Sequence, residues 1–274
     1  MNKLPTAKRV AVVSALVEGM SINSIVRMTG VSKVTILKLL KDLGCACARY
    51  HDDHVRGLKP ARVQCDEVWS FNFCKAKNVA KTKLRDISYG DVWTWTALDS
   101  DSKMIVTYYV GQRSAADADI FMLDLASRVN SHTQLTTDGF PAYPEAVKNA
   151  FGSMVDYAQL IKVYKEDRSR EAHYSPATCI GCKHETLIGY PDPAHISTSH
   201  VERSNLTIRM SMRRFTRLTN GHSKKIENHG HSFSLFVMHY NWCRKHMTLK
   251  GKTPAQACGL ADKPWTLEQL VGLI

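Results

Sequence analysis

The segment from Val63 to Phe71, VQCDEVWSF, places two adjacent carboxylates, Asp66 and Glu67, in an otherwise apolar and aromatic stretch. Its β-branched and aromatic residues predict a β-strand. Burying an ionised carboxylate costs several kcal/mol unless a positive group neutralises it. The segment therefore raises the question of which cation Asp66 or Glu67 holds.

The elements that follow this strand predict an α/β fold. Further strands are expected at residues 91–98, 104–113, 133–139 and 156–164, and helices at 114–129 and 144–151. The resulting order, β-β-β-α-β-α-β, is typical of a mixed sheet with helices packed against it.

Three acids stand out as candidate site residues. Asp66 lies within the first strand, and Asp138 lies where a later strand enters a turn. Ends of neighbouring central strands are where open α/β sheets place their sites. Glu202 lies in the first turns of a predicted helix, which Ser197 or Ser199 can cap. Arg209, seven residues further on, shares a helix face with Glu202.

Residues 1–48 predict a small all-α domain. Ser21 and Ser32 are suited to cap its second and third helices, Gly30 supplies the turn between them, and Gly44 stands where a helix-ending glycine belongs. A short helix, a glycine turn and a second helix are the parts of a helix-turn-helix. The alternative is a helical bundle that binds protein. The outer face of the third helix carries the candidate DNA-binding residues Lys33, Thr35, Lys38 and Lys41.

Two segments rich in cysteine and histidine are compared with zinc sites. The side chains of Cys45, Cys47, His51 and His54 fit no common ligand spacing, so residues 49–61 are interpreted as a polar linker. Residues 165–197 are interpreted as a loop-rich insertion with a single CxxC, Cys179 and Cys182, and irregularly spaced His173 and His184. These spacings disfavour zinc in both segments.

The distribution of charge favours a polyanionic partner. The formal net charge of +12 divides into +7 for residues 1–62, −3 for 63–200 and +8 for 201–250. Nucleic acid would bind the two basic blocks, and the acidic middle would need a cation. A basic surface kept for solubility is the alternative.

Hydropathy and cysteine usage predict a cytoplasmic protein. The chain has no apolar run near the roughly 20 residues that a membrane span needs, and its first residues lack the apolar region of a secretory signal. Its eight cysteines need not pair in a reducing compartment.

Five ordered motifs resemble bacterial insertion-sequence transposases of the DDE superfamily, of the insertion-sequence-one type. These motifs are VQCDEVWSF, ALDSDSKMIVTYYVGQRSA, LTTDGFPAY, HVERSNLTIRMSMRRFTRLTN and HYNWCRKHMTLKGKTPAQA. The resemblance runs from about Arg62 to Leu260 and implies an RNase H-like catalytic core at 62–260, followed by a tail at 261–274. It places Asp66, Asp138 and Glu202 at the three acidic positions and Arg209 at the basic one.

The resemblance implies a metal-dependent site. Three carboxylates that converge on one cleft need cations, and hard oxygen ligands suit two Mg²⁺ or Mn²⁺ ions. We expect Asp66 to bridge both ions, with Asp138 and Glu202 each holding one. Glu67 is expected to point to the opposite face of the strand, as a salt-bridge partner or toward solvent.

Further residues are expected to contact DNA. Arg209, Arg213, Arg214 and Arg217 would hold its backbone. His200 would orient water or a DNA end, although a solvated or capping histidine fits equally.

The implied function is a DNA transposase that binds terminal inverted repeats, cleaves at the element ends to free 3′-OH groups and joins these to target DNA. Acting on two ends suggests a dimer or higher homo-oligomer, working in the bacterial cytoplasm at the nucleoid. Two alternatives remain. A metal-dependent DNA nuclease of the same fold would only hydrolyse, and a non-catalytic helix-turn-helix regulator would leave the three acids unused.

Overall fold

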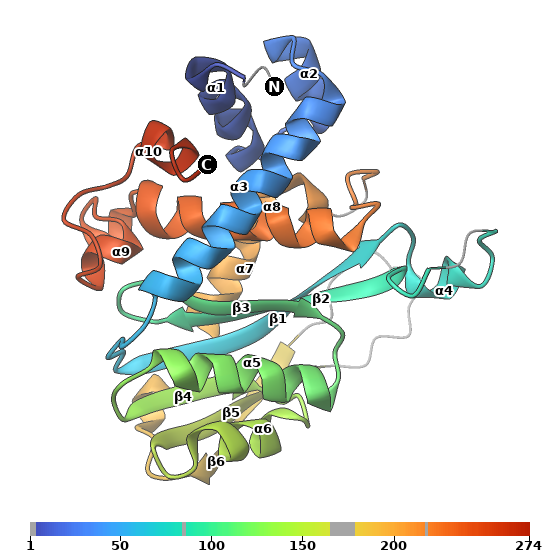
Figure 1. The fold of residues 1–274 in the computed structure, drawn as a ribbon. Helices are drawn as coiled ribbons and strands as arrows, with labels where there is room; N and C mark the ends of the chain where they lie inside the picture. Colours follow the sequence, from blue (N-terminus) through green and yellow to red (C-terminus); the bar gives the residue numbers. More distant parts are fainter. Residues whose placement is uncertain (1–3, 84–85, 165–178, 217–218) are drawn as a thin grey trace.

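A six-stranded mixed sheet forms the centre of the fold in the computed structural model, which describes residues 4–83, 86–164, 179–216 and 219–274 (Figure 1). The strands, in the spatial order β3-β2-β1-β4-β5-β6, are β1 (Arg62–Asn72), β2 (Gly90–Asp99), β3 (Ile105–Gly111), β4 (Thr133–Asp138), β5 (Val155–Tyr164) and β6 (Cys179–Ile188). Strands β1, β4 and β5 run parallel, whereas β1–β2, β2–β3 and β5–β6 pair antiparallel. The predicted α/β class with an RNase H-like mixed sheet is confirmed.

Strand β6 corrects the prediction of a loop-rich insertion at 165–197. Residues 179–188 pair with β5 and extend the sheet. Nearly every residue of β6 is exposed, so the strand has no apolar alternation that would have indicated it. Cys179 and Cys182 are exposed, unpaired thiols on this strand, and His173 lies outside the described residues.

Helices cover both faces of the sheet and create two apolar cores. On one face lie α5 (Ala115–Arg128) and α6 (Tyr143–Phe151), and on the other lie α7 (Ser199–Ser211) and α8 (Ile226–Met238). Alternate residues of β1 point to opposite faces of the sheet. Cys65 lies in the first core and Val68 in the second.

Three helices precede the sheet: α1 (Thr6–Val17), α2 (Ile22–Thr29) and α3 (Lys33–His54). The predicted caps of α2 and α3 are confirmed, since the Ser21 and Ser32 hydroxyls accept the backbone N–H groups of Ser24 and Thr35. Gly30 has the left-handed conformation expected of the turn. The predicted cap of α7 by Ser197 or Ser199 is wrong, because the N-cap residue is Thr198 and its side chain makes no capping hydrogen bond.

The predicted end of the third helix at Gly44 is wrong, because α3 continues to His54. Residues 49–54 are therefore helical, and the predicted linker at 49–61 begins too early. A Cβ at Gly44 would lie 2.6 Å from the Cβ of His231 in α8. This glycine lets α3 and α8 approach each other closely and does not end the helix.

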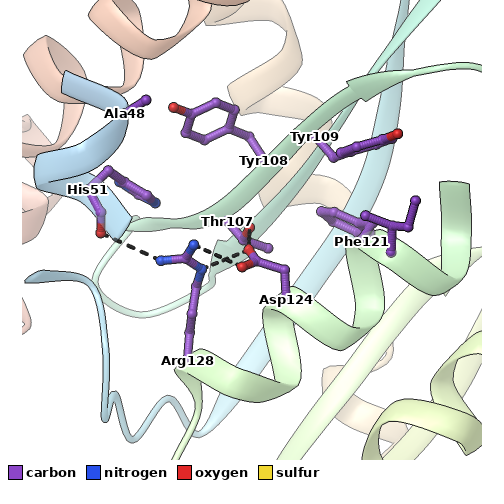
Figure 2. Close-up of a pocket in the computed structure, with 9 residues that line it drawn as sticks. Ala48, His51, Thr107, Tyr108, Tyr109, Phe121, Asp124 and Arg128 are labelled. Atoms are coloured by element: carbon purple, nitrogen blue, oxygen red, sulfur yellow. Dashed lines mark hydrogen bonds and ion pairs between the residues drawn. The ribbon is translucent and has the colours of Figure 1, made fainter. Parts of the chain in front are cut away.

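The end of α3 is fastened to α5 through Arg128 (Figure 2). This buried guanidinium donates to both carboxylate oxygens of Asp124, at 2.7 and 2.9 Å, and to the carbonyls of His51 and Val55. A cation stabilises the partial negative charge of a helix C-terminus. The contact lines a cavity of about 300 Å³ between α3, β3 and α5. His51 is buried within α3, and its ring Nε2 lies 3.0 Å from the Val106 carbonyl, so this residue does not belong to a polar linker.

The remaining elements are short and close the fold around the apolar cores. They are α4 (Ala76–Val79), η2 (Pro193–His195), η3 (Arg213–Phe215), the π-helical turn η4 (His239–Cys243), η5 (Met247–Leu249), α9 (Pro254–Ala257) and α10 (Leu267–Val271). Within the predicted tail at 261–274, Leu270 and Val271 are buried in the same core as α1. No helix among the described residues is long and apolar enough to span a membrane.

Two helical glycines give a matched test of the close contact between α3 and α8. We expect Gly44→Ala to lower the free energy of unfolding by about 1–3 kcal/mol, because the new methyl group overlaps His231. Gly230→Ala in α8 meets nothing within 4 Å and should instead stabilise the protein by about 0.5–1 kcal/mol. Urea denaturation followed by circular dichroism measures both, and a stabilising Gly44→Ala would contradict the close approach.

Candidate metal centre

Asp66 and Asp138 lie side by side on neighbouring parallel strands. The register pairs Cys65 of β1 with Thr137 of β4, so the next residue on each strand is an aspartate. The backbone N–H of Phe140 donates to Asp138 Oδ1 at 3.0 Å and fixes that carboxylate in a turn. Sheet pairing and turn chemistry thus set both positions.

Helix α7 is held against β1 by two side chains from one face of that strand. Gln64 Oε1 accepts the backbone N–H groups of His200 and Val201 at 2.9 and 3.0 Å, which satisfies amides that a helix start leaves free. Asp66 Oδ2 accepts a hydrogen bond from Asn205 Nδ2 at 2.7 Å. Glu202 lies between these two attachments on α7, so they bring it to the site.

Asp66, Asp138 and Glu202 line a single cavity of about 380 Å³. The sequence therefore identified three acids that the fold brings together, and their catalytic and metal-binding roles stay predictions. Within this group Glu202 is more distant. Oxygens of Asp66, Asp138 and Glu67 lie within 4.8 Å of one another, and that tighter cluster does not include Glu202.

Glu67 differs in part from the expectation. Glu67 is only 8% exposed, so of the two expected placements, a salt bridge or a position facing solvent, the second is excluded. It does form the predicted salt bridge, with Arg113 at 3.6 Å. The strand alternation points Glu67 toward the α6 side of the sheet, but its carboxylate still reaches the cluster around Asp66.

Two cations that sequence reasoning missed accompany the acids. Arg113 lies 3.3 Å from Asp138 Oδ2, and its guanidinium stacks over the ring of Phe140 at 4.2 Å. Lys162 of β5 forms an ion pair with Glu202. Arg113 belongs to the quoted segment VGQRSA, so its place after β3 was a usable signal. Lys162 had no comparable signal in the sequence, because only the pairing of β5 with β4 brings this lysine to the acids.

Like charges and burial raise the pKa of several of these acids. Burial, with the neighbouring Asp138 carboxylate, raises the pKa of Asp66 to about 7. Burial and the charges of Asp138 and Asp66 raise the pKa of Glu67 to about 8. Burial also raises the pKa of Asp138 above its usual range. The cluster thus favours protons or other cations.

The donor set fits a hard divalent cation. Among the residues that the structure describes, the cluster offers carboxylate oxygens, which Mg²⁺ and Mn²⁺ prefer, and no thiolate or imidazole of the kind that zinc sites use. Asp66, Asp138 and Glu67 are close enough to share an ion, and Glu202 lines the same cavity. The chemistry of the residues therefore agrees with the predicted magnesium or manganese, with Glu67 as an additional oxygen donor.

The predicted DNA-binding residues lie in varied environments. Lys33, Lys38 and Lys41 are exposed on α3, whereas Thr35 is half-buried and its hydroxyl lies 2.9 Å from that of Ser32. The structure places the other predicted contacts on or after α7, where Arg209 is half-buried and Arg213 is exposed, and Arg217 lies outside the described residues.

Arg214 and His200 make specific contacts with the protein itself. The guanidinium of Arg214 donates to Ser223 Oγ at 2.8 Å, and burial lowers its pKa to about 10. The exposed His200 ring lies 3.2 Å from the Lys103 amine. Burial, followed by that positive charge, lowers the pKa of His200.

Solved structures similar to this chain include two of the Mos1 transposase and one of the piggyBac transposase. A Mos1 paired-end complex with the left transposon end is 14% identical with a TM-score of 0.26, over 57% of this chain and 60% of that chain. The piggyBac synaptic complex with hairpin DNA is 12% identical with a TM-score of 0.38, over 98% and 69%. A Mos1 strand transfer complex is 12% identical with a TM-score of 0.25, over 86% and 78%. No protein-family model and no curated protein matches the chain.

The raised pKa values predict how stability depends on pH. Asp66 and Glu67 have higher pKa values folded than unfolded, so the folded protein retains their protons and is destabilised when they leave. Between pH 6.5 and 8.5, without divalent cations, the free energy of unfolding should fall by on the order of 2 kcal/mol from these two groups. Urea denaturation measures this fall. Glu67→Gln should remove most of it, and equal slopes in both proteins would contradict the assignment.

Proposed function

We propose that this chain is a DDE-type DNA transposase, which cleaves at the ends of its element and joins the freed 3′-OH groups to target DNA. The single observation that carries the proposal is that Asp66, Asp138 and Glu202, from three separate elements, line one cavity. The exposed lysines of α3, which starts at a capped turn after α2, support duplex recognition. Its DNA partners would be the terminal inverted repeats and the target.

We assign each residue at the centre a role, either in holding a metal ion or in orienting a carboxylate that would hold one. Two Mg²⁺ or Mn²⁺ ions, held by Asp66, Asp138 and Glu202, would supply activation of the attacking oxygen and stabilisation of the leaving oxygen. Asn205 keeps Asp66 oriented through its 2.7 Å hydrogen bond. Arg113 orients Asp138 and presents positive charge at the cavity wall, where a DNA phosphate would enter.

The same site would serve a nuclease of this fold that only hydrolyses DNA. The two activities differ in the nucleophile, which is water in hydrolysis and a DNA 3′-OH in strand transfer. A pre-cut element end incubated with a plasmid target distinguishes them, because only a transposase joins the two. We also propose a homo-oligomer acting at the bacterial nucleoid, since paired ends need two centres.

Conservative replacement of the three acids tests the assignment. Asp66→Asn, Asp138→Asn and Glu202→Gln should each retain duplex binding but lose cleavage and strand transfer by at least about a thousandfold, on the scale expected for loss of electrostatic stabilisation. The control is Asp262→Asn, an exposed acid outside the cavity, which should leave both activities unchanged. Near-normal strand transfer by two of the three variants would refute the triad.

The ion pair between Lys162 and Glu202 predicts a change in metal affinity that needs no DNA. Lys162→Met removes an ammonium group that neutralises Glu202, so Mn²⁺ should bind roughly tenfold more tightly, a difference of about 1.4 kcal/mol. Isothermal titration calorimetry measures this affinity. Lys183→Met, on the exposed strand β6, is the matched control and should bind Mn²⁺ like the wild type. Weaker or unchanged binding by Lys162→Met would contradict the competition.

A further inference from the structure

The connection between β1 and β2 carries a dense positive charge. Residues 73–83 contain four lysines and no acid, and all four, Lys75, Lys77, Lys81 and Lys83, are exposed. This connection, described over residues 73–83 and 86–89 and here termed the basic arm, projects beyond the edge of the fold around α4 (Figure 1). A surface kept only for solubility typically intersperses both signs of charge, which these residues do not do.

The base of the basic arm is fixed by specific contacts. The rings of Phe73 and Tyr89 stack with centroids 4.1 Å apart and planes 8° from parallel. Buried Asn72 donates to the Ser88 carbonyl at 2.9 Å, and Asp91 accepts the Ala76 N–H at 3.0 Å. The lysines are therefore presented from an anchored base.

A second basic segment lies against the base of the arm. The Phe73 N–H donates to the Ser223 carbonyl at 2.7 Å, and the rings of Phe71 and His222 lie 4.7 Å apart. The next two residues, Lys224 and Lys225, are exposed. Two cationic segments about 150 positions apart in the sequence thus form one surface, with exposed Asp86 and Glu227 as its acidic neighbours.

We propose that the basic arm, together with Lys224 and Lys225, binds the phosphate backbone of duplex DNA outside the acidic centre. Clustered lysines neutralise phosphates without reading sequence. Asp66 and Asn72 lie six residues apart on β1, about 20 Å at 3.3 Å per residue. A duplex that enters the cavity would therefore meet the arm about six base pairs away, at 3.4 Å per base pair. The choice of DNA as the polyanion rests on the proposed function.

A paired charge removal tests this surface on the full chain. Lys77→Gln combined with Lys81→Gln should weaken binding to a 30-base-pair duplex more than tenfold near 0.1 M salt, and should reduce the slope of log affinity against log salt by about 1.8. Lys148→Gln combined with Lys263→Gln removes the same charge from exposed sites elsewhere and should leave the slope unchanged. Fluorescence anisotropy without divalent cations measures both variants.

The outcomes separate this surface from the catalytic proposal. An unchanged slope in the arm variant, or an equal loss in the control, overturns the basic arm as a DNA contact. A reduced slope supports it even if the acid variants show that the centre does not cleave DNA. Should the arm variant fail to fold, acetylation of the wild type with and without duplex decides the matter. Protection of Lys75, Lys77 and Lys81 by DNA supports the proposal, and equal acetylation overturns it.

Discussion

Two side chains on one face of β1 fix the geometry on which the candidate centre depends. Gln64 binds the first amides of α7, and Asp66 binds Asn205 one turn later. Because strand residues alternate between faces, Cys65 lies in the opposite core. The contact makes Asp66 both a structural anchor and a candidate ligand, so the position of Glu202 depends on the same carboxylate that would bind a metal ion.

The centre is electrostatically incomplete without additional positive charge. Among the described residues, ion pairs join the carboxylates of Glu67 and Asp138 to Arg113 and the carboxylate of Glu202 to Lys162. Burial, and after it the neighbouring negative charges, raises the pKa values of Asp66 and Glu67, so these carboxylates tend to hold protons. Two divalent ions would make the net charge of the centre positive. A positive centre suits binding of a phosphodiester, whose negative charge would increase during the proposed transfer.

Sequence patterns predicted the features that depend on local chemistry or on a motif that resembles those of a known family. The caps at Ser21 and Ser32 are local, and the three acids belong to recognisable motifs. The prediction that α3 ends at Gly44 was wrong because the small size of this glycine allows a close tertiary contact with α8. Sequence spacing does not reveal such a contact. The exposed strand β6 has no apolar periodicity, and Lys162 reaches the acids only through strand pairing. The basic arm was concealed by a net charge of −3 summed over residues 63–200.

The packing of the helices would couple the proposed DNA binding by α3 mechanically to the proposed chemistry at the acids. Because α3 runs to His54 and Arg128 fastens its end to α5, no flexible linker separates its exposed lysines from the sheet. The turn before α2 is also in contact with the end of α7, since a Cβ at Gly19 would lie 2.9 Å from the Ser211 carbonyl. A duplex held by α3 would therefore be oriented relative to Glu202 by rigid elements. Displacing α3 would require breaking the apolar core that it shares with β1.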